Sequence, residues 1–406
     1  MSLPTIPHPP PERIAIIGAG IVGSHLASFL STSLGSRVIL IDRDVKGLPG
    51  STGHAPGFVG QYNELPVLTE LAKRSVSYYS QGGEDGFQRV GGLEISQGLE
   101  ERAQAARSSG LQAELVNKQQ ILDLVPSFVD EGYLAEEGNA GLYFPNDGTA
   151  TAIVVTHTQQ NKAASNGAIL LDAQVISHTK RIDGKGWNLK TNLGEIEVGR
   201  LVYCTGIWAS QLLPQLEHSV VSVSHPYSYS RPHPIREKKT PFVRWPKEHV
   251  YARDHGERDG LGSYAHAPIK VSREDHGETA YGNWEESFDD VLEKGYSLLA
   301  GDIAKSFDGE DTRNFNGLFS VTPDGLPLVG KVEDGLYCAV GVWVTHAAGS
   351  ARLLADELVG GSTNDDEWLR KALDPKRFIK YTSVQEKKDL ESRSLAKYND
   401  IYNKEV

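Results

Sequence analysis

A glycine-rich turn near the N-terminus constrains the fold more than any other feature of the sequence. The segment GAGIVG (18–23) matches the pattern GxGxxG, follows the apolar run RIAII (13–17) and opens a helical pattern that extends to Leu34. A second apolar run, RVILID (37–42), ends at Asp42. Strand, helix and strand in this order predict a βαβ unit, and continuous apolar runs are typical of strands buried in a parallel sheet.

Each part of this unit suits the binding of a dinucleotide. Gly18 permits a tight turn, Gly20 allows the backbone to approach a pyrophosphate, and Gly23 lets the helix pack closely on the strand. The helix N-terminus offers free N–H groups and a positive dipole end to the phosphates. Asp42 can accept hydrogen bonds from the ribose hydroxyls. The alternative interpretation is a glycine-rich turn with an unrelated acid nearby.

Both NAD and FAD bind to this fingerprint, so the fingerprint alone does not identify the cofactor. The position of the later strands can distinguish the two. The apolar runs 200–204 and 335–340 lie far downstream and each ends at a glycine-containing turn. A nicotinamide enzyme usually builds its sheet from consecutive sequence, so scattered strands favour a divided domain around the larger FAD. The turn 341–346 can direct N–H groups toward the negative charge of a reduced flavin. A plain strand-to-helix connection is the alternative at that turn.

We therefore expect an α/β fold in which a split Rossmann-type FAD-binding domain is interleaved with an α+β substrate domain built on an antiparallel sheet. The FAD-binding domain comprises 1–90, 145–215 and 325–370; the substrate domain comprises 91–144 and 216–324; a C-terminal tail, 371–406, packs on the surface. We also expect Thr149 to cap a helix, because it follows the turn PNDG (145–148).

Composition excludes several classes of protein. Lys and Arg total 41 against 53 Asp and Glu, a formal net charge of −12, which argues against binding to nucleic acid or an acidic membrane. With only two cysteines, Cys204 and Cys338, the chain cannot build a disulfide scaffold, a cysteine-only zinc site or a cysteine-ligated iron–sulfur cluster. No metal site is predicted. Without a long apolar run or a recognisable signal, the expected location is the cytoplasm, with a mitochondrial or peroxisomal location left open.

Several ordered motifs give the chain a family resemblance. They are RIAIIGAGIVG (13–23), GSTGHAPGFV (50–59), VGGLEIS (90–96), YARDHGERDGLGSYAH (251–266), FNGLFSVTPDGLPLVG (315–330) and GVWVTHAAG (341–349). At these motifs the chain resembles the D-amino-acid-oxidase-like flavoproteins, and among them the flavin domains of dimethylglycine oxidase and of the dimethylglycine and sarcosine dehydrogenases.

The resemblance implies a set of FAD-binding residues. Ile21, Val22, Asp42 and Arg43 would line the adenosine and diphosphate side; Ser51, Thr52, His54 and Phe58 would lie along the flavin; Val175 would meet the adenine through its backbone; and Val342, Trp343, Val344 and Thr345 would hold the pyrimidine edge of the ring. His54 matches a histidine that is joined covalently to the flavin 8α carbon. Neutral imidazole is a suitable nucleophile, although a histidine in a loop can equally serve as a hydrogen-bond donor.

The resemblance also implies a reaction, the oxidation of a secondary or tertiary amine. Hydride would pass to flavin N5 and leave an iminium ion, and His225 and Tyr251 match the catalytic positions. An N-methylated amino acid such as dimethylglycine or sarcosine would release formaldehyde, because this chain lacks the folate-binding domain of the bifunctional relatives. Molecular oxygen is the expected acceptor. The alternatives are the oxidation of a different amine and FAD binding without catalysis. No role is assigned to Arg231, Arg244, Arg253 or His346.

Overall fold

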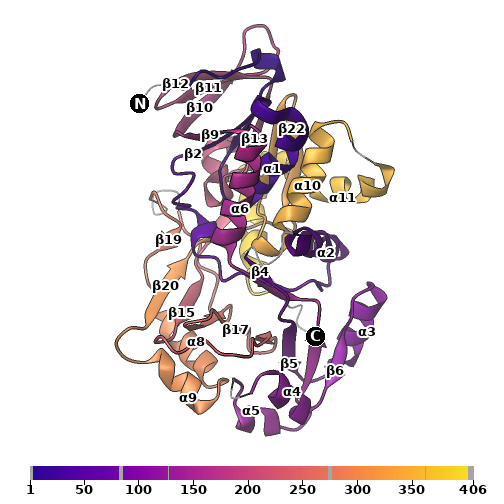
Figure 1. Cartoon of the computed structure of the whole chain (residues 1–406), viewed down its shortest axis with the longest axis vertical. Helices are drawn as coiled ribbons and strands as arrows, with labels where there is room; N and C mark the ends of the chain where they lie inside the picture. The colour runs from indigo at the N-terminus through magenta and orange to yellow at the C-terminus, as the bar shows by residue number, and fades with distance from the viewer. Residues whose placement is uncertain (1–2, 82–85, 127, 273–276, 362, 401–406) are drawn as a thin grey trace.

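Two large sheets and the helices around them make up the chain in the computed structural model, which describes residues 3–81, 86–126, 128–272, 277–361 and 363–400. In Figure 1 a six-stranded sheet lies in the upper part of the molecule and a nine-stranded sheet in the lower part. Within these described residues, no helix combines the length and the apolar character needed to cross a membrane.

The βαβ unit predicted from the glycine-rich turn lies at the centre of the six-stranded sheet. The sheet has the order β22 (Leu328–Glu333), β23 (Leu336–Val340), β13 (Arg200–Tyr203), β1 (Ile14–Ile17), β2 (Val38–Asp42) and β9 (Ile169–Asp172). All neighbours pair in parallel except β22, which is antiparallel to β23 at one edge. Strands from four distant parts of the sequence therefore lie side by side, and the mixed α/β class is confirmed.

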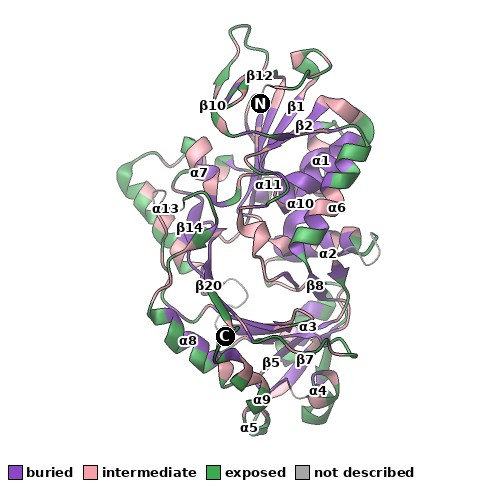
Figure 2. Cartoon of the chain, turned by 60° about the vertical axis from the view of Figure 1, so that its left-hand side comes forward, coloured by how far each residue is buried: buried purple, intermediate pink, exposed green. Residues whose placement is uncertain are grey.

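Both faces of this sheet are covered, which explains why the central strand β1 is apolar at every position. Ile14 and Ile16 belong to a core shared with three helices, α1 (Ile21–Leu34), α6 (Ala152–Ser165) and α10 (Ala347–Leu358). Ala15 and Ile17 point the other way, into a core shared with the three-stranded meander β10 (Val175–Lys180), β11 (Trp187–Thr191) and β12 (Gly194–Val198). Figure 2 shows this part of the molecule as mainly buried strands and helices.

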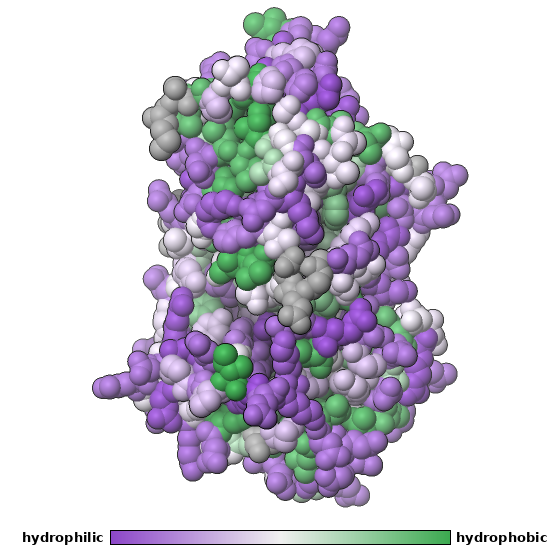
Figure 3. All heavy atoms as spheres, in the orientation of Figure 1, coloured by the Kyte–Doolittle hydropathy of each residue, from purple (hydrophilic) through white to green (hydrophobic). Residues whose placement is uncertain are grey.

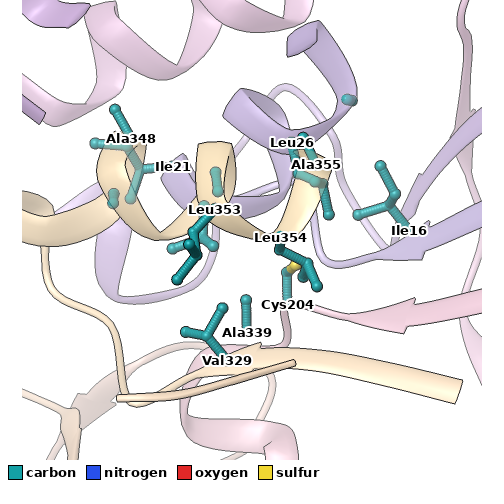
Figure 4. Packing of buried hydrophobic residues seen from close by; sticks show 14 of the residues in the cluster. Ile16, Ile21, Leu26, Cys204, Val329, Ala339, Ala348, Leu353, Leu354 and Ala355 are labelled. Carbon is teal, nitrogen blue, oxygen red and sulfur yellow. The ribbon is translucent and has the colours of Figure 1, made fainter. Parts of the chain in front are cut away.

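Helix α10 packs closely against the ends of β13 and β23. In Figure 4, Leu353 and Leu354 of α10 lie near Cys204, at the end of β13, and near Ala339 of β23. Leu354, Cys204 and Ala339 are all buried. This contact joins the C-terminal part of the sheet to the N-terminal part.

The nine-stranded sheet is largely antiparallel, as expected for the substrate domain. Its order is β19 (Tyr281–Gly282), β20 (Arg313–Gly317), β15 (Pro226–Tyr229), β18 (Asp259–Ser263), β17 (Val250–Asp254), β16 (Phe242–Trp245), β5 (Gly92–Ser96), β7 (Ala140–Phe144) and β6 (Glu114–Val116). One pair, β5 with β16, is parallel. It joins strands from the two chain segments assigned to this domain, so the sheet is mixed at that junction. The helices of this region are α3 (Glu100–Ser108), α4 (Lys118–Leu124), α5 (Glu131–Ala135), α8 (Ser287–Tyr296) and α9 (Gly301–Ala304).

A small sheet between the two large ones corrects the expectation for Thr149. Thr149 lies in β8 (Gly148–Ala150), which pairs with β3 (Phe58–Val59) and β4 (Phe87–Gln88). Helix α6 consequently begins at Ala152, with Thr151 at its N-cap. Tertiary pairing with two strands thus outweighs the local capping preference of Thr149. Helix α2 (Pro66–Gln81) packs beside this sheet.

The tail is helical and held at several points. It contains the end of α11 (Glu367–Leu373) and the whole of α12 (Lys376–Ile379) and α13 (Val384–Ala396). In Figure 2, α13 lies at the side of the molecule near α7 (Ala209–Leu212) and β14 (Val221–Val223), and β14 pairs with β21 (Phe319–Val321). The tail is not confined to the surface, because Tyr398 is fully buried. Figure 3 shows a mainly hydrophilic outer face with smaller apolar patches, as the charge of the chain leads one to expect.

We predict that Gly23→Ala destabilises the protein although it places a better helix former in α1. An added Cβ would lie 1.9 Å from the carbonyl oxygen of Gly18. Overpacking of this kind costs about 1–3 kcal/mol and should exceed the gain of about 1 kcal/mol in helix propensity. Thermal unfolding measures the change. Gly301→Ala is the matched control, since nothing lies within 4 Å of its added Cβ. A Gly23→Ala protein as stable as the parent would contradict the prediction.

Candidate active site

One cavity collects nearly all the predicted site residues. Its wall includes Gly18, Gly20, Ile21, Val22, Asp42, Arg43, Ser51, Thr52, His54, Phe58, Val175, His225, Tyr251, Val342, Trp343, Val344 and Thr345. Of the predicted site residues, only Gly23 does not line the cavity, because it lies behind Gly18 where α1 meets the turn. The structure thus brings these side chains around one space, while their individual roles stay predictions.

The glycine turn forms the first part of the cavity wall. Gly18 has a φ of +102°, and an added Cβ would lie 2.4 Å from the carbonyl oxygen of Cys204. The Ala19 N–H donates to an Asp42 carboxylate oxygen at 2.7 Å, and the Ile21 N–H donates to the Thr52 hydroxyl at 3.1 Å. Burial raises the pKa of Asp42, and the backbone N–H bonds oppose that shift. Asp42 therefore holds the turn itself.

An aromatic residue that the sequence reasoning missed lies beside this turn. Trp208, in the short helical turn after β13, receives the Arg43 guanidinium over its ring at 4.4 Å. Both residues line the cavity. The segment GIW (206–208) follows an apolar run that was recognised as a strand, so the topology could have pointed to it.

His54 is held in a tight loop with one unused nitrogen. The loop is fixed by the Ser51 hydroxyl, which donates to the Leu318 carbonyl at 2.6 Å. The His54 ring packs between Tyr281 and Phe315, with centroid distances of 4.7 and 5.7 Å. Burial lowers the pKa of His54 to about 4, so the imidazole is neutral near pH 7. Its Nδ1 is buried and has no hydrogen-bond partner among the described residues.

The turn after β23 is tied to three other elements. The Thr345 hydroxyl donates to the Phe58 carbonyl at 3.0 Å, the Tyr79 hydroxyl donates to the Val344 carbonyl at 2.6 Å, and the Trp343 indole donates to the Ser320 carbonyl at 3.1 Å. The backbone of 342–345 is therefore a rigid part of the wall. His346 is buried at the start of α10 and does not line the cavity.

His225 and Tyr251 form a direct pair on the nine-stranded sheet. The His225 Nε2 and the Tyr251 hydroxyl are 2.8 Å apart. His225 immediately precedes β15, and Tyr251 lies in β17. These two strands flank β18, in which Gly262 lies opposite Tyr251. An added Cβ on Gly262 would lie 2.6 Å from the Tyr251 ring, so this glycine makes room for the pair. Burial lowers the pKa of His225 well below its ordinary value, and His266 and His54 lower it further.

The three arginines that the sequence left open have different places. Arg253 is buried and donates to the carbonyls of Pro56, Gly57 and Ala150, so it anchors the loop after His54. Arg244 lines the cavity and pairs with Glu94 at 2.8 Å. Arg231 is exposed.

Further cavity residues lie between residues 227 and 319, a part of the chain that contains many His and Tyr residues. They are Tyr227, Tyr264, Phe315 and Phe319.

The wall fits an elongated ligand with a phosphate-bearing part and a flat ring. The glycine turn and the N-terminus of α1 bring backbone without bulky side chains to one part of the cavity wall. Three buried polar atoms on the wall have no hydrogen-bond partner among the described residues: His54 Nδ1, Thr205 Oγ1 and Trp208 Nε1. Buried polar atoms are normally paired, so unpaired ones along a cavity indicate contacts that a ligand can supply.

Comparison with known proteins agrees with this geometry. The family model described as FAD dependent oxidoreductase matches residues 13–357. The mitochondrial dimethylglycine dehydrogenase of Rattus norvegicus is 27% identical over 413 residues, which cover 93% of this chain and 47% of that protein. The 4-methylaminobutanoate oxidase (formaldehyde-forming) of Paenarthrobacter nicotinovorans is 23% identical over 393 residues, covering 92% of this chain and 46% of that protein. The chain thus spans about half the length of these curated relatives.

A solved structure shares the fold over nearly the whole chain. The crystal structure of L-proline dehydrogenase from P. horikoshii matches with a TM-score of 0.74 at 21% identity, covering 91% of this chain and 98% of that chain. The likeness includes both large sheets, because so little of either chain lies outside it.

We predict that Arg253→Met loosens the loop that carries His54. The change removes the donor to three backbone carbonyls and should lower the free energy of unfolding by about 3 kcal/mol. Chemical denaturation measures this loss. Arg231→Met, on the surface, should stay within about 0.5 kcal/mol of the parent. Equal stability of the two variants would show that Arg253 does not anchor the loop.

Proposed function

Because this chain belongs to the family of FAD-dependent oxidoreductases, we propose that it oxidises a secondary or tertiary amine at a C–H bond next to nitrogen. The proposed substrate is an N-methylated amino acid such as dimethylglycine or sarcosine. The observation that carries the proposal is the buried His225–Tyr251 pair on the wall of the same cavity as the glycine turn. The names of the two curated relatives, which describe enzymes of methylated amino acids, support the substrate class.

FAD bound in this cavity would supply the two-electron acceptor for the oxidation. The Gly18–Gly20 turn and the N-terminus of α1 suit the pyrophosphate, since a turn without bulky side chains there meets the positive end of the helix dipole. Asp42 and Arg43 suit the adenosine side, and the rigid backbone of 342–345 suits the ring.

The protein residues have to deal with the proton on the substrate nitrogen. An ammonium group has no lone pair to stabilise the developing iminium, so the amine must lose its proton before the C–H bond breaks. His225 is neutral because burial lowers its pKa, and it can accept a proton through the Tyr251 hydroxyl. Water then adds to the iminium, and an N-methyl substrate yields formaldehyde and the demethylated amine.

A cationic group on the wall supports a substrate with a carboxylate. Arg244 is buried, lines the cavity and places its guanidinium 5.4 Å from the centre of the Phe58 ring. Its partner Glu94 is also bound by Arg102, which pairs in addition with Glu64 at 3.7 Å. A guanidinium fork is well suited to a carboxylate, which favours an amino acid over a simple alkylamine.

We expect anaerobic mixing of the purified yellow protein with methylated amino acids to bleach its flavin absorbance. Under air, formaldehyde and hydrogen peroxide should each form in equimolar amounts with the substrate consumed, and added folate should leave the rate unchanged. Absorbance spectroscopy and product assays measure these quantities. Bleaching by an amine without an N-methyl group, and by none of the methylated amino acids, would favour the alternative amine substrate. A rate that depends on folate would contradict the release of free formaldehyde.

The geometry around His54 also supports a covalent bond between this residue and the flavin 8α carbon. The imidazole is neutral, its loop is fixed, and its buried Nδ1 lacks a partner among the described residues. A neutral imidazole with an available nitrogen lone pair is the form that acts as a nucleophile.

We therefore predict that the parent protein keeps its flavin through acid precipitation and shows flavin fluorescence in a denaturing gel, whereas His54→Ala shows neither. His157→Ala is the control, since His157 bonds the Lys46 carbonyl and does not line the cavity. Flavin retained by the His54→Ala protein after acid treatment, or released by the parent, would exclude the bond at His54.

A further inference from the structure

Tyr398 of the tail enters the interior of the protein and contacts the catalytic pair. Its hydroxyl lies 2.8 Å from His225 Nδ1 and 2.6 Å from His266 Nε2. The side chain is fully buried, and His225 and His266 are 5% and 4% exposed. Tyr251, His225, Tyr398 and His266 therefore form one continuous hydrogen-bonded chain that begins at the cavity wall.

The tail is firmly attached on both sides of this contact. In α13, Glu391 bonds His218 Nδ1 at 2.6 Å and Lys270 Nζ at 2.6 Å. After Tyr398, the Asn399 side-chain amide donates to the carbonyls of Tyr264 and His266, at 2.6 and 3.0 Å. The position of the Tyr398 hydroxyl is thus determined by contacts outside the hydrogen-bonded chain.

The far end of the chain sets the direction of every bond in it. His266 Nδ1 lies 2.8 Å from the Ala267 carbonyl, which can only accept, so Nδ1 carries the proton of the neutral ring. His266 Nε2 must then accept, and Tyr398 donates to it. The Tyr398 oxygen in turn accepts from His225 Nδ1–H, which leaves His225 Nε2 to accept from Tyr251. The Tyr251 hydroxyl gives its proton to His225 and presents an acceptor oxygen to the cavity.

We propose that these four residues are a proton relay that takes the proton of the substrate ammonium group from Tyr251 to His266, with Tyr398 as the link. This inference rests on the proposed amine oxidation. Tyr398 and His266 act through the catalytic pair and are positioning residues, since neither lines the cavity.

The relay moves one proton in four transfers and reverses each hydrogen bond. The substrate N–H proton passes to the Tyr251 oxygen as the Tyr251 proton passes to His225 Nε2. The His225 Nδ1 proton passes to the Tyr398 oxygen, and the Tyr398 proton passes to His266 Nε2. The substrate is left as a neutral amine, both tyrosines and His225 are again neutral, and the positive charge rests on His266. No electrons are exchanged, so no further reactant is required.

Within the relay, the surroundings favour His266 over His225 as the residue that carries the proton. Tyr264 packs on His225 at 4.3 Å and Phe288 packs on His266 at 4.9 Å, which shields the relay from water. Burial lowers the pKa of both histidines, but the Ala267 carbonyl opposes the shift at His266. Among the described residues, the titratable or charged groups that face the relay include Tyr264, His54, Tyr227 beside Tyr251 and Arg244 opposite Tyr251 on β16, and the lowered pKa of His54 keeps it uncharged. A charge on His266 is also further from the iminium than a charge on His225.

The test is the rate of anaerobic flavin reduction in Tyr398→Phe, followed by stopped flow across pH with the amine that reduces the parent protein. The variant keeps the ring, which packs on Phe319, and loses only the hydroxyl. At neutral pH we expect reduction at least about 100-fold slower than in the parent, since proton transfer by positioned groups contributes about 10²–10⁴-fold. Above about pH 11, where an amine with a pKa of about 10.4 is mostly neutral, the difference should fall to about 2-fold. Tyr381→Phe, a tail tyrosine outside the relay, should match the parent.

Each outcome bears on a different statement. A parent protein that no amine reduces would refute the proposed function itself. A reducible parent with an unimpaired Tyr398→Phe variant would refute the relay alone. A Tyr398→Phe deficit of the same size at every pH would also refute it, because a purely structural defect would not be relieved when the amine becomes neutral. His266→Gln is the second variant should Tyr398→Phe fail to fold, and the same loss with the same relief at high pH is expected.

Discussion

The close contact of backbone with backbone at the first glycine turn is the constraint on which the rest of the structure depends. Gly18, Gly23 and Cys204 approach so closely that a methyl group on either glycine would overlap a carbonyl oxygen. This approach lets α1 begin directly at the ends of β1 and β13. The same strand ends then form one wall of the cavity. The absence of side chains at Gly18 and Gly23 therefore allows the close helix packing and leaves the turn open on the cavity side.

The second wall comes from a different part of the chain and needs its own anchors. The nine-stranded sheet supplies His225 and Tyr251, while Arg253 of that sheet reaches across to the carbonyls beside His54. The two large sheets are thus joined by buried hydrogen bonds at the cavity itself. Rigid elements hold the proposed catalytic pair in place, which is the arrangement that the proposed hydride and proton transfers over short distances require.

The sequence predicted those parts of the fold and site that local patterns encode. The glycine turn, Asp42 and the apolar runs indicate a parallel sheet because their spacing reflects backbone geometry. Thr149 was misplaced because its strand pairs with two segments distant in sequence, and no local signal reports such pairing. Trp208, Arg244 and Tyr398 reach the site through long-range packing of the same kind. The domain boundaries and the roles of individual site residues stay predictions.

The order of strands in the six-stranded sheet has a consequence for how the nascent protein matures. β13 lies between β1 and β23, and Leu201 pairs with Leu336 across the segment that builds most of the other sheet. During synthesis, β13 therefore exposes an unpaired, apolar edge until β23 has been made. Such an edge invites mispairing and aggregation, and contacts between distant residues slow folding. We therefore expect the nascent chain to need chaperone protection in that interval and to refold slowly after complete denaturation. Both follow from building one sheet out of strands that lie far apart in the chain.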